Sequence, residues 1–327
     1  SVTLKKHRVQ VFRAVVCKTT SPLKTMSDSD IPYLPSHWSK RLDPTKIVDA
    51  HFKLLREQSE LVIERLKPEI VQYGQSDSNE LVYYWFTPSD SGGNAKSPLF
   101  VFIHGGYWQT PELTARMCCH MADTFVNNGL HFASLGYDCV PAVSIEDTVR
   151  LVETGLRACL ERARSDGLSG VYVAGHSAGG HLAVTAGACV HWPGELAGLI
   201  KGVLPISGVF DLMPLVKTSV NHPLGMNTAR AAALSPMRGL QQQLLASPVR
   251  APILAIVGAL ESPEFTRQSR ELCDLLRRHG RQADVNIVPE RDHFDIIELL
   301  ADPADPLSQR ILAFIRSGGV IDSADDS

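Results

Sequence analysis

A serine between two glycines forms the most informative motif of the chain. Residues 175–179 read Gly-His-Ser-Ala-Gly and directly follow the strand-like run Val-Tyr-Val-Ala at 171–174. A strand that passes through Gly-x-Ser-x-Gly into a helix forms a nucleophile elbow, a sharp turn that pushes the serine side chain out at the end of a sheet. We therefore predict that Ser177 is a nucleophile that attacks a carbonyl carbon. The alternative is a buried serine in an ordinary glycine turn.

A second glycine motif follows an earlier apolar run. Residues 99–103 have the length of a buried strand and lead into His-Gly-Gly-Tyr-Trp-Gln at 104–109. A strand followed by His-Gly-Gly is one form of the loop that stabilises an oxyanion in esterases and lipases. We expect the backbone N–H groups of Gly105, Gly106 or Tyr107 to donate to the oxyanion, together with that of Ala178.

The general base must be found among twelve histidines. The strand-like run 285–288 is followed by Pro-Glu-Arg-Asp-His-Phe at 289–294. A histidine in the loop after the last strand is suited to accept the serine proton, and the chain order of serine, acid and histidine is that of α/β-hydrolases. We predict that His293 is the base.

The acid is expected in the loop after the strand-like run 252–257. Glu261 is the best candidate there to accept the histidine N–H and to stabilise the imidazolium as it forms. Glu264 is the near alternative, and Asp211, after the preceding strand, is the distant one, although hydrogen bonding within its own loop is its more ordinary role. Asp292 adjoins the histidine in sequence and is badly placed to reach its ring.

These motifs resemble those of kynurenine formamidases (arylformamidases), which belong to the α/β-hydrolase superfamily. The matching segments are His-Gly-Gly-Tyr-Trp-Gln at 104–109, Gly-His-Ser-Ala-Gly-Gly-His-Leu at 175–182, Ser-Gly-Val-Phe-Asp-Leu-Met-Pro-Leu-Val at 207–216, Ser-Pro-Glu-Phe at 262–265 and Asp-His-Phe at 292–294. The resemblance covers residues 31–316, and the Tyr-Trp-Gln extension is its most specific part. The chain departs from it at Glu261, where the family pattern leads us to expect aspartate.

The resemblance implies hydrolysis of N-formyl-L-kynurenine to formate and L-kynurenine, a step of tryptophan catabolism. Ser177 would form a formyl-enzyme and His293 would transfer the protons, without a metal or an organic cofactor. Four aromatic side chains are candidate contacts for the substrate ring: Tyr107, Trp108, Phe210 and Phe294. Asn221 and Arg230 lie in the polar insert 212–247, which we expect to cap the site, but the sequence assigns no residue to the substrate carboxylate.

Strand-like and helix-like segments alternate along the chain. The expected strands are 69–73 and 81–86, which form an opening hairpin, and then 99–103, 131–135, 171–174, 203–206, 252–257 and 285–288. The expected helices are 49–66, 111–128, 145–164, 178–190, 265–279 and 307–316. This order predicts an α/β-hydrolase fold, a mostly parallel central sheet with helices on both faces, whose catalytic residues lie at the carboxyl ends of the strands.

The composition is that of an enzyme acting on a small molecule. With 327 residues, 44% of them hydrophobic, and a net charge of −3, the chain can bury a large core and has no excess of basic residues for nucleic acid or an anionic membrane. No apolar run approaches the roughly twenty residues of a membrane span. The seven cysteines are odd in number and lack metal-binding spacing, so we expect reduced thiols and a cytoplasmic location. The oligomeric state stays open, with a homodimer as one option.

The two ends of the chain differ from the middle. The first twenty-five residues contain six lysines and arginines and no acid before Asp28, without the apolar core of a signal peptide. We expect residues 1–30 to be a disordered basic extension, with an organelle transit peptide or sequence upstream of a start at Met26 as alternatives. The tail 317–327 is also expected to be disordered.

Two other functions fit the same motifs. One is a carboxylesterase with broad acyl substrates that uses the same triad. The other is a non-enzymatic binding protein on a hydrolase scaffold, because a fold does not determine a function. The presence of Ser177, His293 and the glycine loop favours an enzyme.

Overall fold

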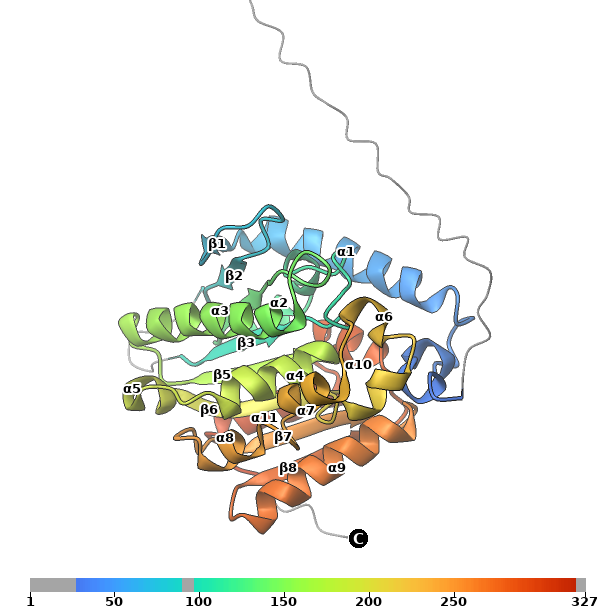
Figure 1. The fold of residues 1–327 in the computed structure, drawn as a ribbon. Helices are drawn as coiled ribbons and strands as arrows, with labels where there is room; N and C mark the ends of the chain where they lie inside the picture. The colour runs from blue at the N-terminus through green and yellow to red at the C-terminus, as the bar shows by residue number, and fades with distance from the viewer. Residues whose placement is uncertain (1–27, 90–96, 322–327) are drawn as a thin grey trace, which may run out of the picture.

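The structure, a computed structural model, describes residues 28–89 and 97–321, and these contain an eight-stranded sheet (Figure 1). Its strands are β1 (Glu69–Gln72), β2 (Val82–Phe86), β3 (Leu99–Ile103), β4 (His131–Leu135), β5 (Val171–His176), β6 (Ile200–Ile206), β7 (Ile253–Gly258) and β8 (Ala283–Val288). They lie in the order β1-β2-β4-β3-β5-β6-β7-β8. The β1–β2 and β2–β4 pairs are antiparallel and the other neighbours are parallel. The predicted hairpin and the mostly parallel sheet are confirmed.

Helices cover both faces of this sheet. The longer α-helices are α1 (Ile47–Leu66), α3 (Ile145–Ser165), α4 (Ala178–Val184), α7 (Thr228–Leu234), α9 (Pro263–Arg278) and α11 (Pro306–Arg316). Short α-helices are α2 (Ala122–Val126), α5 (Gly194–Ala197), α6 (Asn221–Leu224), α8 (Gln241–Ala246) and α10 (Asp295–Glu298). The 3₁₀ turns are η1 (Ile31–Tyr33), η2 (Pro35–His37), η3 (Arg116–Cys118), η5 (Met213–Lys217) and η6 (Leu299–Ala301), and η4 (Thr185–Cys189) is a π-helical turn.

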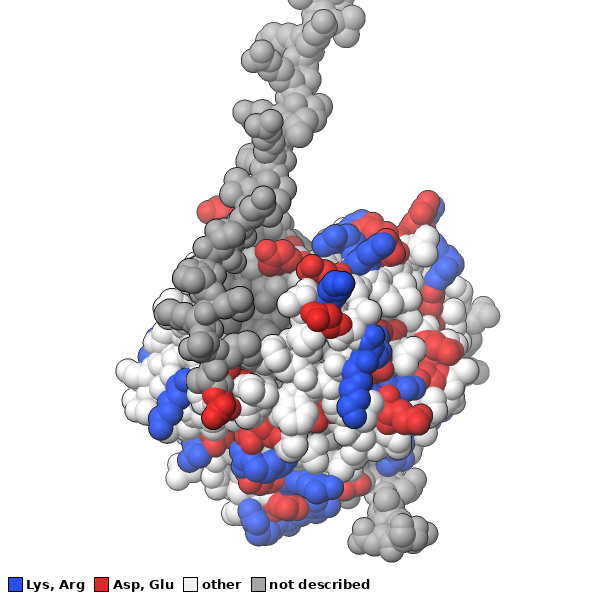
Figure 2. All heavy atoms as spheres, turned by 90° about the vertical axis from the view of Figure 1, so that its right-hand side faces the viewer, with Lys and Arg blue, Asp and Glu red and all other residues white. Residues whose placement is uncertain are grey.

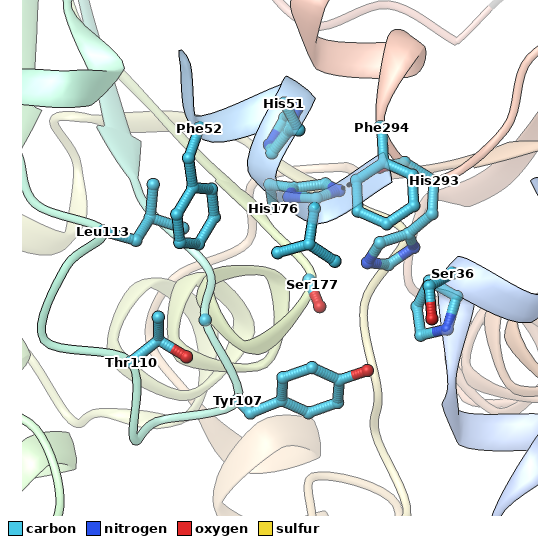
Figure 3. A pocket seen from close by; sticks show the side chains of 13 residues that line it. Ser36, His51, Phe52, Tyr107, Thr110, Leu113, His176, Ser177, His293 and Phe294 are labelled. Atoms are coloured by element: carbon cyan, nitrogen blue, oxygen red, sulfur yellow. Dashed lines mark hydrogen bonds between the residues drawn. The ribbon is translucent and has the colours of Figure 1, made fainter. Parts of the chain in front are cut away.

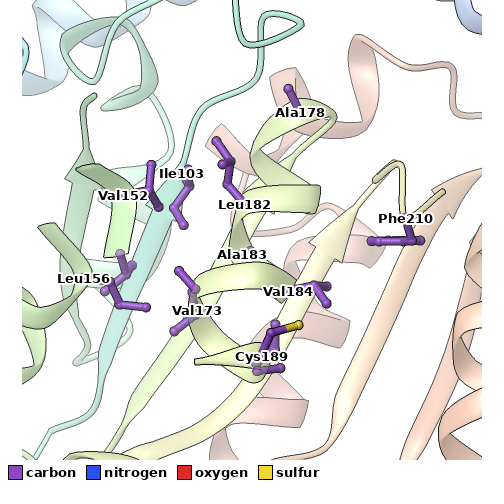
Figure 4. Packing of buried hydrophobic residues seen from close by; sticks show 14 of the residues in the cluster. Ile103, Val152, Leu156, Val173, Ala178, Leu182, Ala183, Val184, Cys189 and Phe210 are labelled. Carbon is purple, nitrogen blue, oxygen red and sulfur yellow. The ribbon is translucent and has the colours of Figure 1, made fainter. Parts of the chain in front are cut away.

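Two apolar cores lie on opposite faces of the sheet because successive strand side chains point to opposite sides. Val101 and Ile103 of β3 belong to the core that α3, α4 and α9 cover, part of which Figure 4 shows. Phe100 and Phe102 belong to the other core, with side chains of α1, α2 and α11. The buried sheet is therefore a rigid frame that presents the carboxyl ends of its parallel strands at one edge.

One predicted helix, 111–128, is wrong. This segment contains only η3 and α2, joined by turns. Residues 117–122 are all buried, so the segment has no exposed polar face of the kind that an amphipathic surface helix requires. It lies beneath α1, where Ser59 donates a hydrogen bond of 2.8 Å to the carbonyl oxygen of Met117. The predicted helix 178–190 is likewise shorter, since α4 ends at Val184 and η4 follows.

Most of the two ends that we predicted to be disordered lies outside the described residues. Of these ends, only residues 28–30 and 317–321 are described. Within these parts, Asp30 is buried and accepts a hydrogen bond of 2.5 Å from the Ser219 amide. On the face that Figure 2 shows, the basic and acidic side chains of the described residues are interspersed. Throughout 28–89 and 97–321, no helix has the combination of length and apolar character that crossing a bilayer requires.

Candidate active site

The nucleophile elbow forms where β5 ends and α4 begins. Ser177 has a φ of +55°, a left-handed conformation that is strained for a residue with a side chain. A Cβ atom on Gly175 would lie 2.1 Å from the Gly179 carbonyl oxygen, and one on Gly179 would lie 2.1 Å from that of Ile103. The motif therefore needs glycine at both positions, and the resulting turn directs the Ser177 side chain into a cavity (Figure 3).

The candidate base and acid are in direct contact. His293 Nδ1 donates a hydrogen bond of 2.5 Å to Glu261 Oε2, and both side chains are buried. The other oxygen, Glu261 Oε1, accepts hydrogen bonds from the Gly258 amide at 2.7 Å and from Ser207 Oγ at 2.6 Å. Since a carboxylate only accepts, the proton of the neutral imidazole lies on Nδ1 and leaves Nε2 as the basic nitrogen. His293 and Ser177 line the same cavity.

The other carboxylates considered for this role are held elsewhere. Asp211 forms a two-pronged ion pair with Arg238, at 2.6 and 2.5 Å, and accepts a hydrogen bond within its own loop. Glu264 accepts a hydrogen bond of 2.6 Å from the Tyr33 hydroxyl. Asp292 accepts the first backbone N–H groups of α10. The structure thus brings Glu261, and none of these three, to the base.

The two predicted oxyanion segments meet beside the nucleophile. A Cβ atom on Gly105 would lie 2.8 Å from the His176 carbonyl oxygen, so glycine permits the loop to pack against the elbow. Gly106 has a φ of +103°, which also favours glycine. Within the described residues, the backbone N–H groups of Gly106, Tyr107 and Ala178 have no backbone acceptor. They remain able to donate to a negatively charged oxygen near Ser177.

A buried histidine connects the elbow to the loop of the base. His176 Nε2 donates a hydrogen bond of 2.9 Å to the backbone carbonyl of His293, and the two rings lie 4.5 Å apart between centroids. Burial lowers the pKa of His176 well below its ordinary value, and the neighbouring His293 lowers it further. His176 is therefore a neutral positioning residue rather than a second base.

Two cavities adjoin Ser177. The larger has a volume of about 150 Å³, and much of its wall comes from the N-terminal segment: Pro35, Ser36, Val48, His51 and Phe52. The rest includes Tyr107, Thr110, Leu113 and Phe294 (Figure 3). The smaller has a volume of about 10 Å³ and is lined, with Ser177, by Tyr33, Tyr107, Trp108, Ala178, Val209, Leu215 and Phe265.

The predicted aromatic contacts divide into two groups. Tyr107 lines both cavities, Phe294 the larger and Trp108 the smaller. Phe210 lines neither, because its side chain is 0% exposed and its ring packs over Gly208 in the core. Phe210 is therefore part of the core and of neither described cavity wall.

The insert 212–247 contributes little to the two cavity walls. Leu215 is the one residue of the insert 212–247 that lines either described cavity. The Asn221 amide group is bonded to the backbone of its own loop, and Arg230 forms an ion pair with Glu146 at 2.6 Å. Neither side chain faces the site. Much of the wall of the larger cavity comes instead from residues within 33–52. No motif in a single sequence identifies such residues, because long-range packing brings them to the site.

Comparison with known proteins first defines the class. A family model described as BD-FAE matches residues 86–229. The fold is similar to that of esterase B from Lactobacillus rhamnosis, with a TM-score of 0.61 and 20% identity over 83% of this chain and 94% of that one. It is also similar to a Silicibacter sp. TM1040 protein provisionally named a thioesterase, with a TM-score of 0.72 and 27% identity over 86% of this chain and 98% of that one. The protein is a hydrolase of α/β-hydrolase fold.

Sequence relatives narrow this class to a family. The chain is 33% identical to a kynurenine formamidase of Danio rerio over 90% of its own length and 99% of the relative's. It is 32% identical to that of Salmo salar, over 86% and 93% of the two chains. The chain belongs to the kynurenine formamidase family, as its motifs predicted.

Proposed function

We propose that this protein hydrolyses the formamide of N-formyl-L-kynurenine to formate and L-kynurenine. Two relatives that match almost the full length of the chain are named kynurenine formamidases. The arrangement of Ser177, His293 and Glu261 supplies a nucleophile, a base and an orienting carboxylate.

In this mechanism, Nε2 of His293 takes the proton of Ser177 as Oγ attacks the formyl carbon. The carbonyl oxygen becomes an oxyanion that accepts hydrogen bonds from Ala178 and the glycine loop. The C–N bond then breaks, and the departing aniline nitrogen takes the proton from His293. Water next gives a proton to His293 and attacks the formyl-enzyme, and Ser177 recovers its proton as formate leaves. Glu261 stabilises the imidazolium that forms in each step.

The proposal of a formyl group, rather than a larger acyl group, rests on the size of the smaller cavity. A volume of about 10 Å³ is close to the minimum that a single water molecule needs. Trp108, Val209 and Phe265 are buried walls of this space. A formyl hydrogen or oxygen fits there beside Ser177, whereas a longer acyl chain would have to displace these side chains. The larger cavity then receives the aromatic leaving group.

The test is a substrate panel measured on the wild type and on Ser177→Ala. We expect kcat/KM for N-formyl-L-kynurenine to exceed that for its N-acetyl analogue and for phenyl acetate by at least about 10-fold, since each misplaced methyl group costs roughly 1–3 kcal/mol. Faster hydrolysis of the ester by orders of magnitude would establish a carboxylesterase instead. A Ser177 that hydrolyses no member of the panel and resists labelling by a fluorophosphonate would indicate a binding protein.

A further inference from the structure

A second histidine–glutamate pair lies beside the first. His51 of α1 directs Nδ1 to Glu298 Oε1 of α10 at 2.7 Å. Both side chains are buried, with exposed fractions of 3% and 7%. The mechanism uses neither residue, yet His51 lines the larger cavity together with Ser177 and His293 (Figure 3). His51 therefore faces the space that the leaving group would occupy.

Glu298, the partner of His51, belongs to a network of ion pairs. Arg41 donates a hydrogen bond of 2.8 Å to the second oxygen of Glu298 and pairs with Asp292 at 2.9 Å. Burial alone would raise the pKa of Glu298, but the hydrogen bonds from His51 and Arg41 bring it below its ordinary value. Glu298 is thus ionised, and with Asp292 it outnumbers the single guanidinium.

The remaining ring nitrogen of His51 is free to bind a ligand. Among the described residues, Nε2 has no hydrogen-bond partner, and it is not one of the fully enclosed polar atoms. The other histidines on the cavity wall have different tasks: His176 is a buried neutral donor and His293 is the base. The rest of the wall is apolar or carries hydroxyl groups. His51 is therefore the group of this wall best placed to contact a polar ligand without taking part in the catalytic steps.

We propose that His51, held by Glu298 and Arg41, binds the carboxylate of the substrate's leaving group, so that in the complex each ring nitrogen donates to a carboxylate. This inference rests on the proposed function, which gives that leaving group an amino-acid head. It assigns the specificity for an anionic substrate to α1, on a different element from the residues that do the chemistry. Phe294, whose ring lies 5.2 Å from that of His51, would separate this charge contact from the aromatic ring of the substrate.

The test compares N-formyl-L-kynurenine with its α-carboxamide, which keeps the ring, the ketone and the amino group but loses the negative charge. Because a hydrogen bond between charged groups is lost with the amide, we expect the wild type to prefer the acid by about 10- to 100-fold in kcat/KM. His51→Gln should bring this ratio close to one, mainly through KM for the acid. Phe52→Leu is the matched control, because it changes the same wall without a charge and should alter both values by a similar factor. A wild-type ratio near one, or an unchanged ratio in His51→Gln, would overturn the proposal.

Two further measurements cover the case of a variant that does not fold and that of a wild type that does not hydrolyse N-formyl-L-kynurenine. If His51→Gln does not fold, Glu298→Gln removes the carboxylate that accepts from the His51 ring and should lower the same ratio. If the wild type does not hydrolyse N-formyl-L-kynurenine at all, the proposed function fails, and 4-acetoxyphenylacetate can be compared with 4-acetoxyphenylacetamide. A preference for the anionic ester that His51→Gln abolishes would then support the anion site alone. Equal rates for the two esters would reject it.

Discussion

Two regions build this site in different ways. Ser177, Glu261 and His293 follow the carboxyl ends of β5, β7 and β8, which are neighbouring or nearby strands of one sheet. The N-terminal segment from η1 to the first turns of α1 forms much of the cavity wall. It is attached through side-chain contacts such as Tyr33 to Glu264 rather than through the sheet. The first region determines the chemistry, and the second determines what fits.

The difference teaches how a site can change its substrate without changing its reaction. Residues at strand ends are constrained by the elbow, where the glycines cannot be replaced without backbone clashes. Residues 33–52 are less constrained in their geometry, because they need only supply the shape and charge of the cavity wall. Substitutions in the first region should therefore act on kcat, and those in the second on KM and substrate preference.

Removal of the nucleophile tests the first region most severely. Ser177→Ala should lower kcat by roughly 10⁴- to 10⁶-fold, since the remaining groups only bind and polarise the substrate. The protein should fold as well as the wild type, because the substitution removes no contact that the fold needs. Single-turnover kinetics with a melting curve provide the measurement. A variant that keeps a tenth of the wild-type rate would show that another group attacks.

The acid is tested by a pair of matched variants. Glu261→Gln should lower kcat by about 10⁴-fold, because an amide cannot stabilise the imidazolium and disfavours the required tautomer. Asp211→Asn breaks the ion pair with Arg238 and should lower the free energy of unfolding by about 1 kcal/mol, with kcat changed only a few-fold. Steady-state kinetics and urea unfolding of both variants separate the two effects. The reverse pattern would transfer the role of the acid to Asp211.

The same contrast explains what could be predicted from the sequence. Gly175 and Gly179 flank the serine because the turn excludes every other residue, so the motif alone predicts the geometry of the turn. The candidate acid and base were found because they follow strand-like runs in a set order. The sequence could not show that Phe210 lies in the core, because an aromatic residue beside the site looks the same in sequence whether it faces the cavity or the core. His51 was missed because α1 reaches the cavity through long-range packing with α10.

Acid pH should lower the stability of the whole fold through its buried histidines. Burial lowers the pKa of His104, His120 and His181 to about 4 from 6.5. In the unfolded chain these histidines therefore bind protons below pH 6.5, whereas in the folded chain they do so only near pH 4. Stability is complete above pH 6.5 and falls across this window as the pH decreases, by about 1.4 kcal/mol per unit for each histidine.

Urea unfolding at pH 7.5 and 5.5 measures this loss. The wild type should lose about 4 kcal/mol from the three groups together, before the opposing contribution of carboxyl groups such as Asp295, whose pKa burial raises to about 6. His120→Gln, which keeps a donor for the Ile297 carbonyl, should reduce the difference by about 1.4 kcal/mol. An unchanged difference in this variant would mean that His120 is protonated in the folded state.

The smallest effect concerns the attachment of the N-terminal segment. Tyr33→Phe removes the 2.6 Å hydrogen bond to Glu264 and should lower the free energy of unfolding by about 1–2 kcal/mol. Because Tyr33 also lines the smaller cavity, KM should rise several-fold while kcat stays within about two-fold. Tyr73→Phe is the control, since its hydroxyl donates to the Gly136 carbonyl at 2.6 Å and lines neither cavity. It should cost similar stability and leave KM unaltered. A loss of kcat in Tyr33→Phe alone would show that the segment also positions the strand-end residues, and the division between the two regions would fail.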